Sequence, residues 1–234
     1  MYWNRVCAAV IPCFDEAAYI RRVVTEVQRR LSHVIVVDDG STDTTAENAK
    51  SAGADVVRLP KNSGKGAALR HGWQRAHARG FLWVLMFDGD GQHAADDLPK
   101  FFDCAGKTGA PLVVGNRMDN SDAMPFVRRC ANRWMSRRIS KMTSTDLPDS
   151  QCGFRLAHLE TLLNLSLRVN RFEIESAMLV AFLTAGKKVE FVPVQTIYET
   201  QTSKINPVAD SWRWLRWRLT QRVPLRPCST IRVP

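Results

Sequence analysis

The 234-residue sequence contains no apolar stretch close to the roughly 20 residues that a membrane-spanning helix needs. Its first residues lead into a strand-like run and not into the apolar segment of a secretory signal. The six cysteines include no Cys-x-x-Cys pair and no zinc-binding spacing, so we expect free thiols that pack in the interior. Internal repeats and low-complexity tracts are also missing. These absences predict a cytoplasmic protein without structural disulfides or zinc.

Two common phosphate-binding signatures are absent as well. No Gly-x-Gly-x-x-Gly follows the first predicted strand, which disfavours a Rossmann dehydrogenase. The segment Gly64-Lys65-Gly66 is no Walker motif, because a glycine five residues earlier and a Ser or Thr after the lysine are both missing. Lys65 still stands at a predicted loop-to-helix transition, where backbone N–H groups and the helix dipole favour an anion. A solvated lysine is the alternative.

What the chain does contain is ordinary for a globular domain, except for its charge. Hydrophobic residues make up 45% and charged residues 24%, which is enough to build one well-buried α/β core. The formal charge of +10 is concentrated in residues 128–141 and in six arginines after Ser211. A basic face of this kind predicts an anionic partner, either a phospholipid surface or a lipid phosphate. Nucleic acid is disfavoured because no known binding motif is present.

The order of predicted elements indicates an α/β fold. In the first half, strand patterns alternate with helix patterns, which predicts parallel strands joined by crossover helices. Strands are expected at residues 6–11, 34–37, 55–59, 81–87, 112–114 and 189–194, and helices over 20–31, towards 51, and over 67–79, 96–104, 126–142 and 173–185. Pro12 would end the first strand, Asp15 would cap the first helix, and Thr42 or Asp43 would cap the second. Residues 149–154 are expected to form a loop.

One predicted strand, residues 81–87, ends abruptly in Asp88-Gly89-Asp90. In an extended turn, the two carboxylates would face one hard cation, for which Mg²⁺ or Mn²⁺ is suited. Gly89 would let a diphosphate oxygen approach the backbone closely. A solvated acidic turn is the alternative, because Asp and Gly are the residues that turns prefer.

A second acidic pair strengthens the metal-site prediction. The strand at residues 34–37 runs directly into Asp38-Asp39. Because the carboxyl ends of parallel strands meet at one edge of a sheet, the two pairs are expected to share one crevice.

Taken together, the motifs make the chain similar to the family 2 glycosyltransferases, and among them to the polyprenyl-phosphate sugar transferases of the dolichyl-phosphate mannose synthase type. The matching segments are residues 10–16, 37–43, 62–66, 88–93, 149–155 and 203–204. The resemblance implies a GT-A fold, which is a single α/β domain with a mostly parallel central sheet and helices on both faces. The domain would span residues 1–205, and residues 206–234 would form a basic tail rich in Trp and Arg.

The resemblance also implies roles for individual residues on the donor side. Asp88 and Asp90, with Gln92, would hold Mg²⁺ or Mn²⁺ against the diphosphate and so stabilise the leaving group. His93 is expected beside these ligands, because imidazole is a poor ligand of Mg²⁺. The donor-binding residues would be Pro12, Phe14, Glu16, Asp38, Asp39, Lys65, Asp88, Gly89, Asp90 and Lys204. The arginine that the resembled synthases carry shortly before the Ser-Lys pair is missing, so the nucleotide base is not predicted.

The acceptor is expected to be a phosphate. A hydroxyl acceptor must lose a proton and needs a general base, whereas a phosphate monoester has a second pKa of about 6 and is already anionic. Positioning cations then replace the base, and the resemblance assigns Arg117 firmly and Arg129 loosely to the lipid phosphate. Gln151 would lie on the acceptor side. Asp149 is the candidate base if the acceptor is a hydroxyl.

Two features outside these motifs have more than one interpretation. Either Glu173 or Glu175 would reach the site and orient arginines, since the two point differently on a helix. The tail at residues 211–219 interleaves Trp with Arg, a pattern suited to the headgroup region of an anionic bilayer. A helix packed on the domain by its tryptophans is the alternative.

The sequence therefore predicts an inverting, metal-dependent glycosyltransferase that moves a hexose from a GDP- or UDP-sugar to a polyprenyl phosphate. The enzyme would lie peripherally on the inner face of the membrane. Inversion follows from the resemblance and fits one in-line displacement without a protein nucleophile. The alternatives are a family 2 transferase with a sugar or lipid hydroxyl acceptor, acting in cell-envelope glycan synthesis, and a non-enzymatic sugar-nucleotide binding protein.

Overall fold

Strands of almost uninterrupted apolar sequence form the centre of the molecule, because they are buried on both faces. The computed structural model describes residues 2–120, 124–197 and 207–220. The strands are β1 (Cys7–Cys13), β2 (Val34–Asp38), β3 (Asp55–Arg58), β4 (Trp83–Met86), β5 (Leu112–Asn116), β6 (Arg155–His158) and β7 (Val189–Pro193). Within the described part of the chain they form one sheet in the order β3-β2-β1-β4-β6-β5-β7.

The sheet is mostly parallel, as the sequence predicts, and β6 is the strand that runs the other way. It lies between β4 and β5 and pairs antiparallel with both, so that Arg155 is opposite Met86 on one side and Val114 on the other. No strand is predicted at these residues, because the four-residue segment is too short to show an alternating pattern. This register places the residues after β4 beside the residues before β6.

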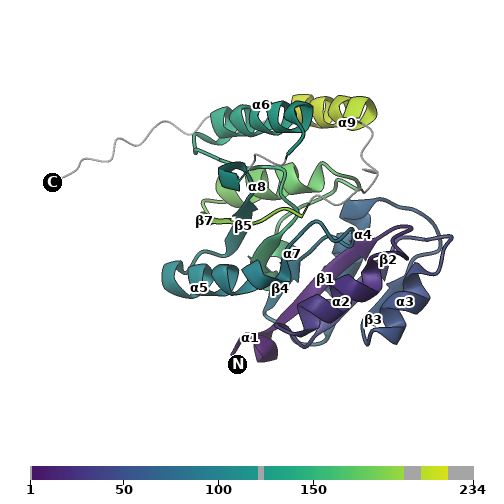
Figure 1. Cartoon of the computed structure of the whole chain (residues 1–234). Helices are drawn as coiled ribbons and strands as arrows, with labels where there is room; N and C mark the ends of the chain where they lie inside the picture. Colours follow the sequence, from purple (N-terminus) through teal and green to yellow (C-terminus); the bar gives the residue numbers. More distant parts are fainter. Residues whose placement is uncertain (1, 121–123, 198–206, 221–234) are drawn as a thin grey trace.

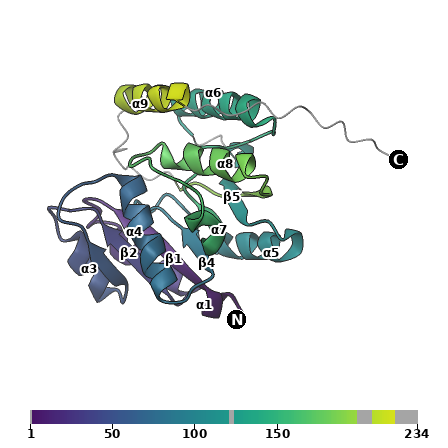
Figure 2. The ribbon, with the colours of Figure 1, turned by 180° about the vertical axis from the view of Figure 1, so that it is seen from behind.

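Helices cover both faces of the sheet. The helices are α1 (Trp3–Val6), α2 (Ile20–Gln28), α3 (Thr45–Ser51), α4 (Lys65–Ala78), α5 (Leu98–Thr108), α6 (Phe126–Thr143), α7 (Leu159–Leu163), α8 (Ile174–Thr184) and α9 (Pro207–Thr220), with short 3₁₀ turns at Ala95–Asp97 and Met118–Asn120. Helix α2 lies in front of the strands in Figure 1, and α4 lies in front of them in the reverse view of Figure 2. Helices α6 and α9 form a further layer beyond α8 (Figure 1).

Three details of the predicted elements are wrong. Strand β1 does not end at Pro12 but continues to Cys13. The proline is tolerated because β4 ends at Met86, opposite Val10, so no partner on that side needs an N–H from residue 12. Asp15 and Thr42 cap no helix, since the Asp15 carboxylate accepts the N–H of Thr42 at 2.8 Å and so joins two loops. The other predicted cap of the second helix, Asp43, accepts the N–H of Thr45, the first residue of α3, at 2.9 Å.

Helix α9 packs on the domain through Trp214 and Trp217. Trp214 is 3% exposed and Trp217 is 8% exposed. The indole N–H of Trp214 donates to the Ser176 hydroxyl on α8 at 2.9 Å, and its ring lies 5.3 Å from that of Trp134 on α6. The domain boundary predicted at residue 205 lies in a segment outside the described residues. No helix among the described residues is long and apolar enough to cross a membrane.

Arg155 anchors the loop before β6. Its side chain is buried and donates to three backbone carbonyls, those of Cys152 at 2.8 Å, Glu175 at 2.6 Å and Ser150 at 3.0 Å. These bonds tie the loop at residues 149–154 to the first turn of α8. The loop is where the sequence predicts it, and the arginine that ends the motif fixes its shape.

We expect Arg155→Met to lower the free energy of unfolding by about 3 kcal/mol or more, because each buried carbonyl left without a donor costs about 1–3 kcal/mol. Urea unfolding measures this loss. Arg75→Met is the matched control, since Arg75 forms a surface ion pair with Asp55, and such pairs contribute little. Equal effects of the two substitutions would show that Arg155 is no anchor.

Candidate active site

Asp88 lies at the centre of the candidate site, two residues after the end of β4. Its Oδ1 atom lies 2.6 Å from the Lys65 ammonium, and its Oδ2 atom lies 3.2 Å from Nε2 of His93. Lys65 lies at the predicted loop-to-helix transition and is the first residue of α4, which begins two residues before the predicted residue 67. A cation therefore stands where the backbone N–H groups of a helix point. His93 is buried between the rings of Phe87 and Phe154.

Glu175 holds the other side of Lys65. Its Oε1 atom lies 2.6 Å from the ammonium, so Lys65 bridges two carboxylates that come from β4 and α8. Burial alone would lower the pKa of Lys65, but Asp88 and Glu175 outweigh it and raise the pKa above its ordinary value. Burial likewise favours a higher pKa for Asp88, yet Lys65 and His93 hold this pKa below its ordinary value. Both groups are therefore charged at neutral pH.

Glu173 or Glu175 is predicted to orient arginines, but the side chain of Glu175 instead binds Lys65. The signal for this contact is weak in the sequence, because 110 positions separate the two residues. Only the packing of α8 against the sheet edge brings them together.

Gly153 makes the approach of the loop to Asp88 possible. A Cβ atom at this position would lie 2.5 Å from Oδ2 of Asp88 and 2.8 Å from Nζ of Lys65. Since real side chains do not approach so closely, glycine is required for the observed contact between the loop at residues 149–154 and Asp88. The antiparallel register of β4 with β6 places these two residues opposite each other.

The predicted metal ligands have the chemistry for a hard cation but do not form a complete cage. Asp90 is half-buried, and its Oδ1 atom accepts the N–H of Gln92 at 3.0 Å. Across the described ranges, no group of three or more His, Cys, Asp or Glu side chains is arranged to hold a metal. Mg²⁺ is commonly held by one or two carboxylates together with substrate phosphates. The residues present thus fit a metal that arrives with a diphosphate.

The acids after β2 fix the loops beside Lys65. Asp38 is fully buried and accepts the N–H of Ser41 at 2.9 Å. Asp39 accepts the N–H groups of Ser63 at 2.8 Å and Gly64 at 2.7 Å, which ties the β2 loop to the start of α4. The two acidic motifs therefore lie at the same edge of the sheet, with Lys65 between them.

The predicted residues at the end of β1 lie at this edge as well. Pro12, Phe14 and Glu16 are half-buried, and the backbone N–H of Glu16 donates to the hydroxyl of Thr45 at 2.8 Å. Gly89 is buried, and a Cβ there would lie 2.5 Å from the sulfur of Cys13. Lys204 lies outside the described residues.

Arg117 and Asp149 form a buried pair. Nε and Nη2 of Arg117 lie 2.8 Å and 3.0 Å from the two carboxylate oxygens, and the backbone N–H of Arg117 donates to the same group at 3.2 Å. Burial alone would raise the pKa of Asp149, but the guanidinium and the backbone N–H groups outweigh it and keep the pKa below its ordinary value. A carboxylate held in this way is a weak base, and it orients the arginine.

The remaining predicted acceptor residues are engaged within the fold. The amide nitrogen of Gln151 donates to the hydroxyls of Ser150 at 2.7 Å and Ser176 at 2.9 Å. The Arg129 guanidinium lies 5.8 Å from the ring centre of Phe126. Arg128, which the prediction does not single out, is the arginine of α6 that contacts the acidic loop, at 3.4 Å from the side-chain oxygen of Gln92.

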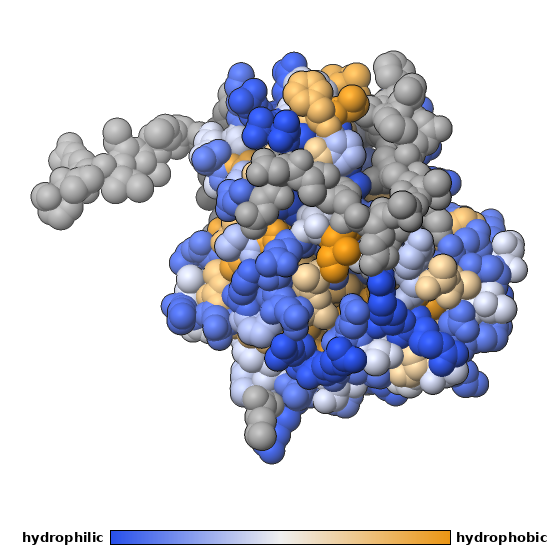
Figure 3. Space-filling model, in the orientation of Figure 1, coloured by the Kyte–Doolittle hydropathy of each residue, from blue (hydrophilic) through white to orange (hydrophobic). Residues whose placement is uncertain are grey.

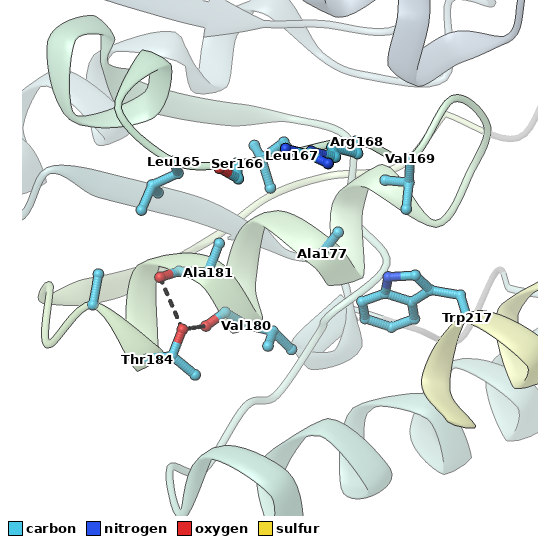
Figure 4. Close-up of a pocket in the computed structure, with 11 residues that line it drawn as sticks. Leu165, Ser166, Leu167, Arg168, Val169, Ala177, Val180, Ala181, Thr184 and Trp217 are labelled. Carbon is cyan, nitrogen blue, oxygen red and sulfur yellow. Dashed lines mark hydrogen bonds between the residues drawn. The ribbon is translucent and has the colours of Figure 1, made fainter. Parts of the chain in front are cut away.

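Two other features do not contribute to the site. Burial raises the pKa of the Cys152 thiol to about 11, which fits the packing role predicted for it. A cavity of about 570 Å³ lies between α8, residues 165–169 and Trp217 (Figure 4), and none of the predicted site residues lines it.

Residues 8–163 match the family described as Glycosyl transferase family 2. The chain belongs to this family. A glycosyltransferase of Haloferax volcanii, AglJ, is 33% identical over 213 residues, which are 88% of this chain and 68% of that protein. A UDP-N-acetylglucosamine–dolichyl-phosphate N-acetylglucosaminyltransferase of Methanococcus voltae is 29% identical over 83% of this chain and 87% of that protein. The chain is thus a glycosyltransferase that resembles enzymes named for polyprenyl-phosphate acceptors.

Solved structures confirm the GT-A fold of this glycosyltransferase. Glucosyl-3-phosphoglycerate synthase of Mycobacterium tuberculosis superposes with a TM-score of 0.73, over 95% of this chain and 82% of that chain. Its sequence identity is 19%, so the likeness concerns the fold alone. The same enzyme has been crystallised with Mn²⁺ and UDP-glucose, with a TM-score of 0.70.

We expect Asp149→Asn to lower the free energy of unfolding by about 3 kcal/mol at pH 7, because it removes one partner of a buried ion pair. A carboxylate whose folded-state pKa is depressed contributes stability above its unfolded-state pKa of about 3.9 and loses this contribution as the pH falls further. The difference between wild type and variant should therefore shrink below about pH 3.9. Urea unfolding at pH 7 and pH 3 measures it, and equal losses at both would contradict the pairing.

We expect Gly153→Ala to reduce the turnover of the glycosyltransferase about 100-fold, because the added methyl group displaces Asp88 and Lys65 by a fraction of an ångström or more. Initial rates of nucleotide release measure the effect. Gly106→Ala on α5 is the matched control, since its Cβ would meet nothing within 4 Å. Full activity of the Gly153 variant would show that the contact between the two motifs is not needed.

Proposed function

We propose that this glycosyltransferase moves a hexose, with inversion, from a nucleotide diphosphate sugar to a polyprenyl phosphate. The names of several relatives support this acceptor class, among them a dolichyl-phosphate β-glucosyltransferase of Saccharomyces cerevisiae, 24% identical over 87% of this chain, and a dodecaprenyl-phosphate galacturonate synthase of Rhizobium johnstonii, 29% identical over 63%.

The observation that carries the proposal is the pairing of Asp149 with Arg117. A hydroxyl acceptor requires a general base, and the candidate base is bound by a guanidinium that keeps its pKa low. A phosphate acceptor requires no base, because it is already anionic and needs to be positioned. The buried Arg117, which Asp149 orients, supplies a cation of the kind that recognises phosphate.

On the donor side, the proposal assigns the diphosphate to the edge formed by Lys65, Asp88 and Asp90. Mg²⁺ or Mn²⁺ bound there by Asp88 and Asp90, with Gln92, would neutralise charge that develops on the leaving diphosphate. Lys65 supplies a fixed positive charge beside the same atoms, and Glu175 holds it in place. Pro12, Phe14, Glu16, Asp38, Asp39 and Gly89 would form the pocket for the base and ribose.

Nucleotide release from a panel of UDP- and GDP-sugars with Mn²⁺, with and without a short polyprenyl phosphate, tests this function. We expect one donor to support release and the lipid to stimulate it at least tenfold. Asp90→Asn should lower the stimulated rate about 100-fold, because the leaving diphosphate loses charge stabilisation. Asp96→Asn is the matched control, because Asp96 is an exposed acid six residues further along the chain.

Two results would overturn the proposal. Release that does not depend on the lipid, and that rises with a sugar or lipid hydroxyl, would identify a hydroxyl-directed family 2 transferase. Tight donor binding without release from any donor would indicate a binding protein.

A further inference from the structure

Helix α6 has an outer face that nothing in the described part of the chain covers. Phe126 is 69% exposed, Val127 75% and Trp134 43%, so three of the eight exposed large hydrophobic residues in the described part of the chain lie on this helix. Arginines and a lysine surround them. The exposed residues of this outer face are Phe126, Val127, Cys130, Arg133, Trp134, Arg137, Arg138 and Lys141.

Helical geometry places these residues on one side. At about 100° per residue, the eight members fall within an arc of about 140°. The three residues of α6 that are buried, Asn132, Ser136 and Ile139, lie on the opposite side. The helix therefore has two distinct sides, because small polar residues and Ile139 face the domain, whereas a mixed apolar and basic stripe faces outward.

The charge of the outer face has one sign. Helix α6 contains no Asp or Glu in its 18 residues. The guanidinium of Arg138 lies 5.4 Å from the ring centre of Trp134, so the aromatic and cationic groups of the face are interleaved. Figure 3 shows apolar groups among hydrophilic ones at the top of the molecule, over the layer formed by α6 and α9.

We propose that the outer face of α6 docks onto an anionic bilayer surface. Amphipathic helices that lie in the membrane interface combine Lys and Arg with Trp, Phe and other apolar residues, and their apolar groups enter the boundary between headgroups and acyl chains. Each Lys or Arg near an anionic surface adds attraction. Nucleic acid would engage the cations but leaves Phe126 and Val127 without an apolar partner.

This docking would bring the candidate site to the headgroups, and in this respect it rests on the proposed function. The side of α6 opposite the outer face contacts the site loops, since Ser136 accepts the N–H of Ser150 at 2.9 Å. Arg128, in the first turn, reaches Gln92 of the acidic loop. A helix with its side chains is about 10 Å across, so the bilayer plane would lie about this distance from the acceptor loop.

The sequence points to the Trp-rich segment of α9 as the membrane contact, and the structure assigns that role to α6. Trp214 and Trp217 are turned towards α8 and the interior. Trp214 supports the docking face from behind, through its contact with Trp134.

Flotation with vesicles tests the docking without any use of catalysis. The full-length protein should bind phosphatidylcholine vesicles that contain about 30% phosphatidylglycerol much more tightly than vesicles of phosphatidylcholine alone. A triple variant, Arg137→Gln, Arg138→Gln and Lys141→Gln, should weaken binding about 100-fold. The matched control, Arg29→Gln, Lys107→Gln and Lys187→Gln, removes three exposed charges elsewhere and should weaken it far less.

A second pair of variants tests the apolar part. Phe126→Ser with Val127→Ser should weaken binding at least tenfold, whereas Leu82→Ser, at a residue 51% exposed on another surface, should have no effect. All of these residues are exposed, so the variants keep their fold, which thermal unfolding verifies. Nucleotide release with a water-soluble short-chain acceptor should stay unchanged, so a failure of the docking can be told apart from a failure of the proposed function.

Cys130 provides a direct readout, because it is the exposed cysteine of the described chain and lies within the outer face. A polarity-sensitive fluorophore on Cys130, with Cys104→Ser and Cys228→Ser to prevent other labelling, should shift to the blue when anionic vesicles are added. No shift, or equal binding to neutral vesicles, would overturn the proposal. Binding to duplex DNA through the same cations, or a dimer that Phe126→Ser and Val127→Ser dissolve, each without vesicle binding, would also overturn it.

Discussion

The antiparallel pairing of β6 between β4 and β5 is the constraint on which the candidate site depends. It puts the chain before Arg155 next to the chain after Met86, and in this way Gly153 meets Asp88 although 65 positions separate them. On its other edge, the N–H of Gly115 donates to the carbonyl of Phe154 at 2.9 Å, which brings Arg117 to the loop that carries Asp149. One short strand thus joins the residues proposed to bind the donor to those proposed to bind the acceptor.

Ion pairs between opposite charges then hold these joined segments of the chain in place. Lys65 lies between Asp88 and Glu175, and Arg117 is bound by Asp149, so each of these five charges has a partner of opposite sign. Both pairs connect elements that are distant in sequence, and the loss of either partner would leave a buried charge alone. The groups that stabilise the fold here are therefore the same groups that are proposed to bind the anionic parts of the substrates.

Helix α6 links the candidate site to the outside of the molecule. Its inner side contacts the loop at residues 149–153 and the acidic loop, and its outer side exposes apolar and basic groups. An enzyme that acts on a lipid phosphate must take a charged headgroup without removing its chain from the bilayer. The proposed docking of α6 would meet this requirement, because one side of the helix contacts the candidate site and the other would contact the bilayer.

The sequence by itself determined the strands with continuous apolar runs, the helices with regular spacing and the two acidic motifs at strand ends, because these signals are local. It also determined the family, through motifs such as residues 88–93 and 149–155 that keep their order. Only the tertiary structure decided which residues meet: Glu175 binds Lys65 rather than an arginine, Asp149 binds Arg117, and Arg128 rather than Arg129 reaches Gln92. Trp214 and Trp217 of α9 point inward for the same reason, since the direction of a side chain depends on what packs beside its helix. Contacts between distant segments follow from sheet register and helix packing, and the local pattern of residues determines neither of these.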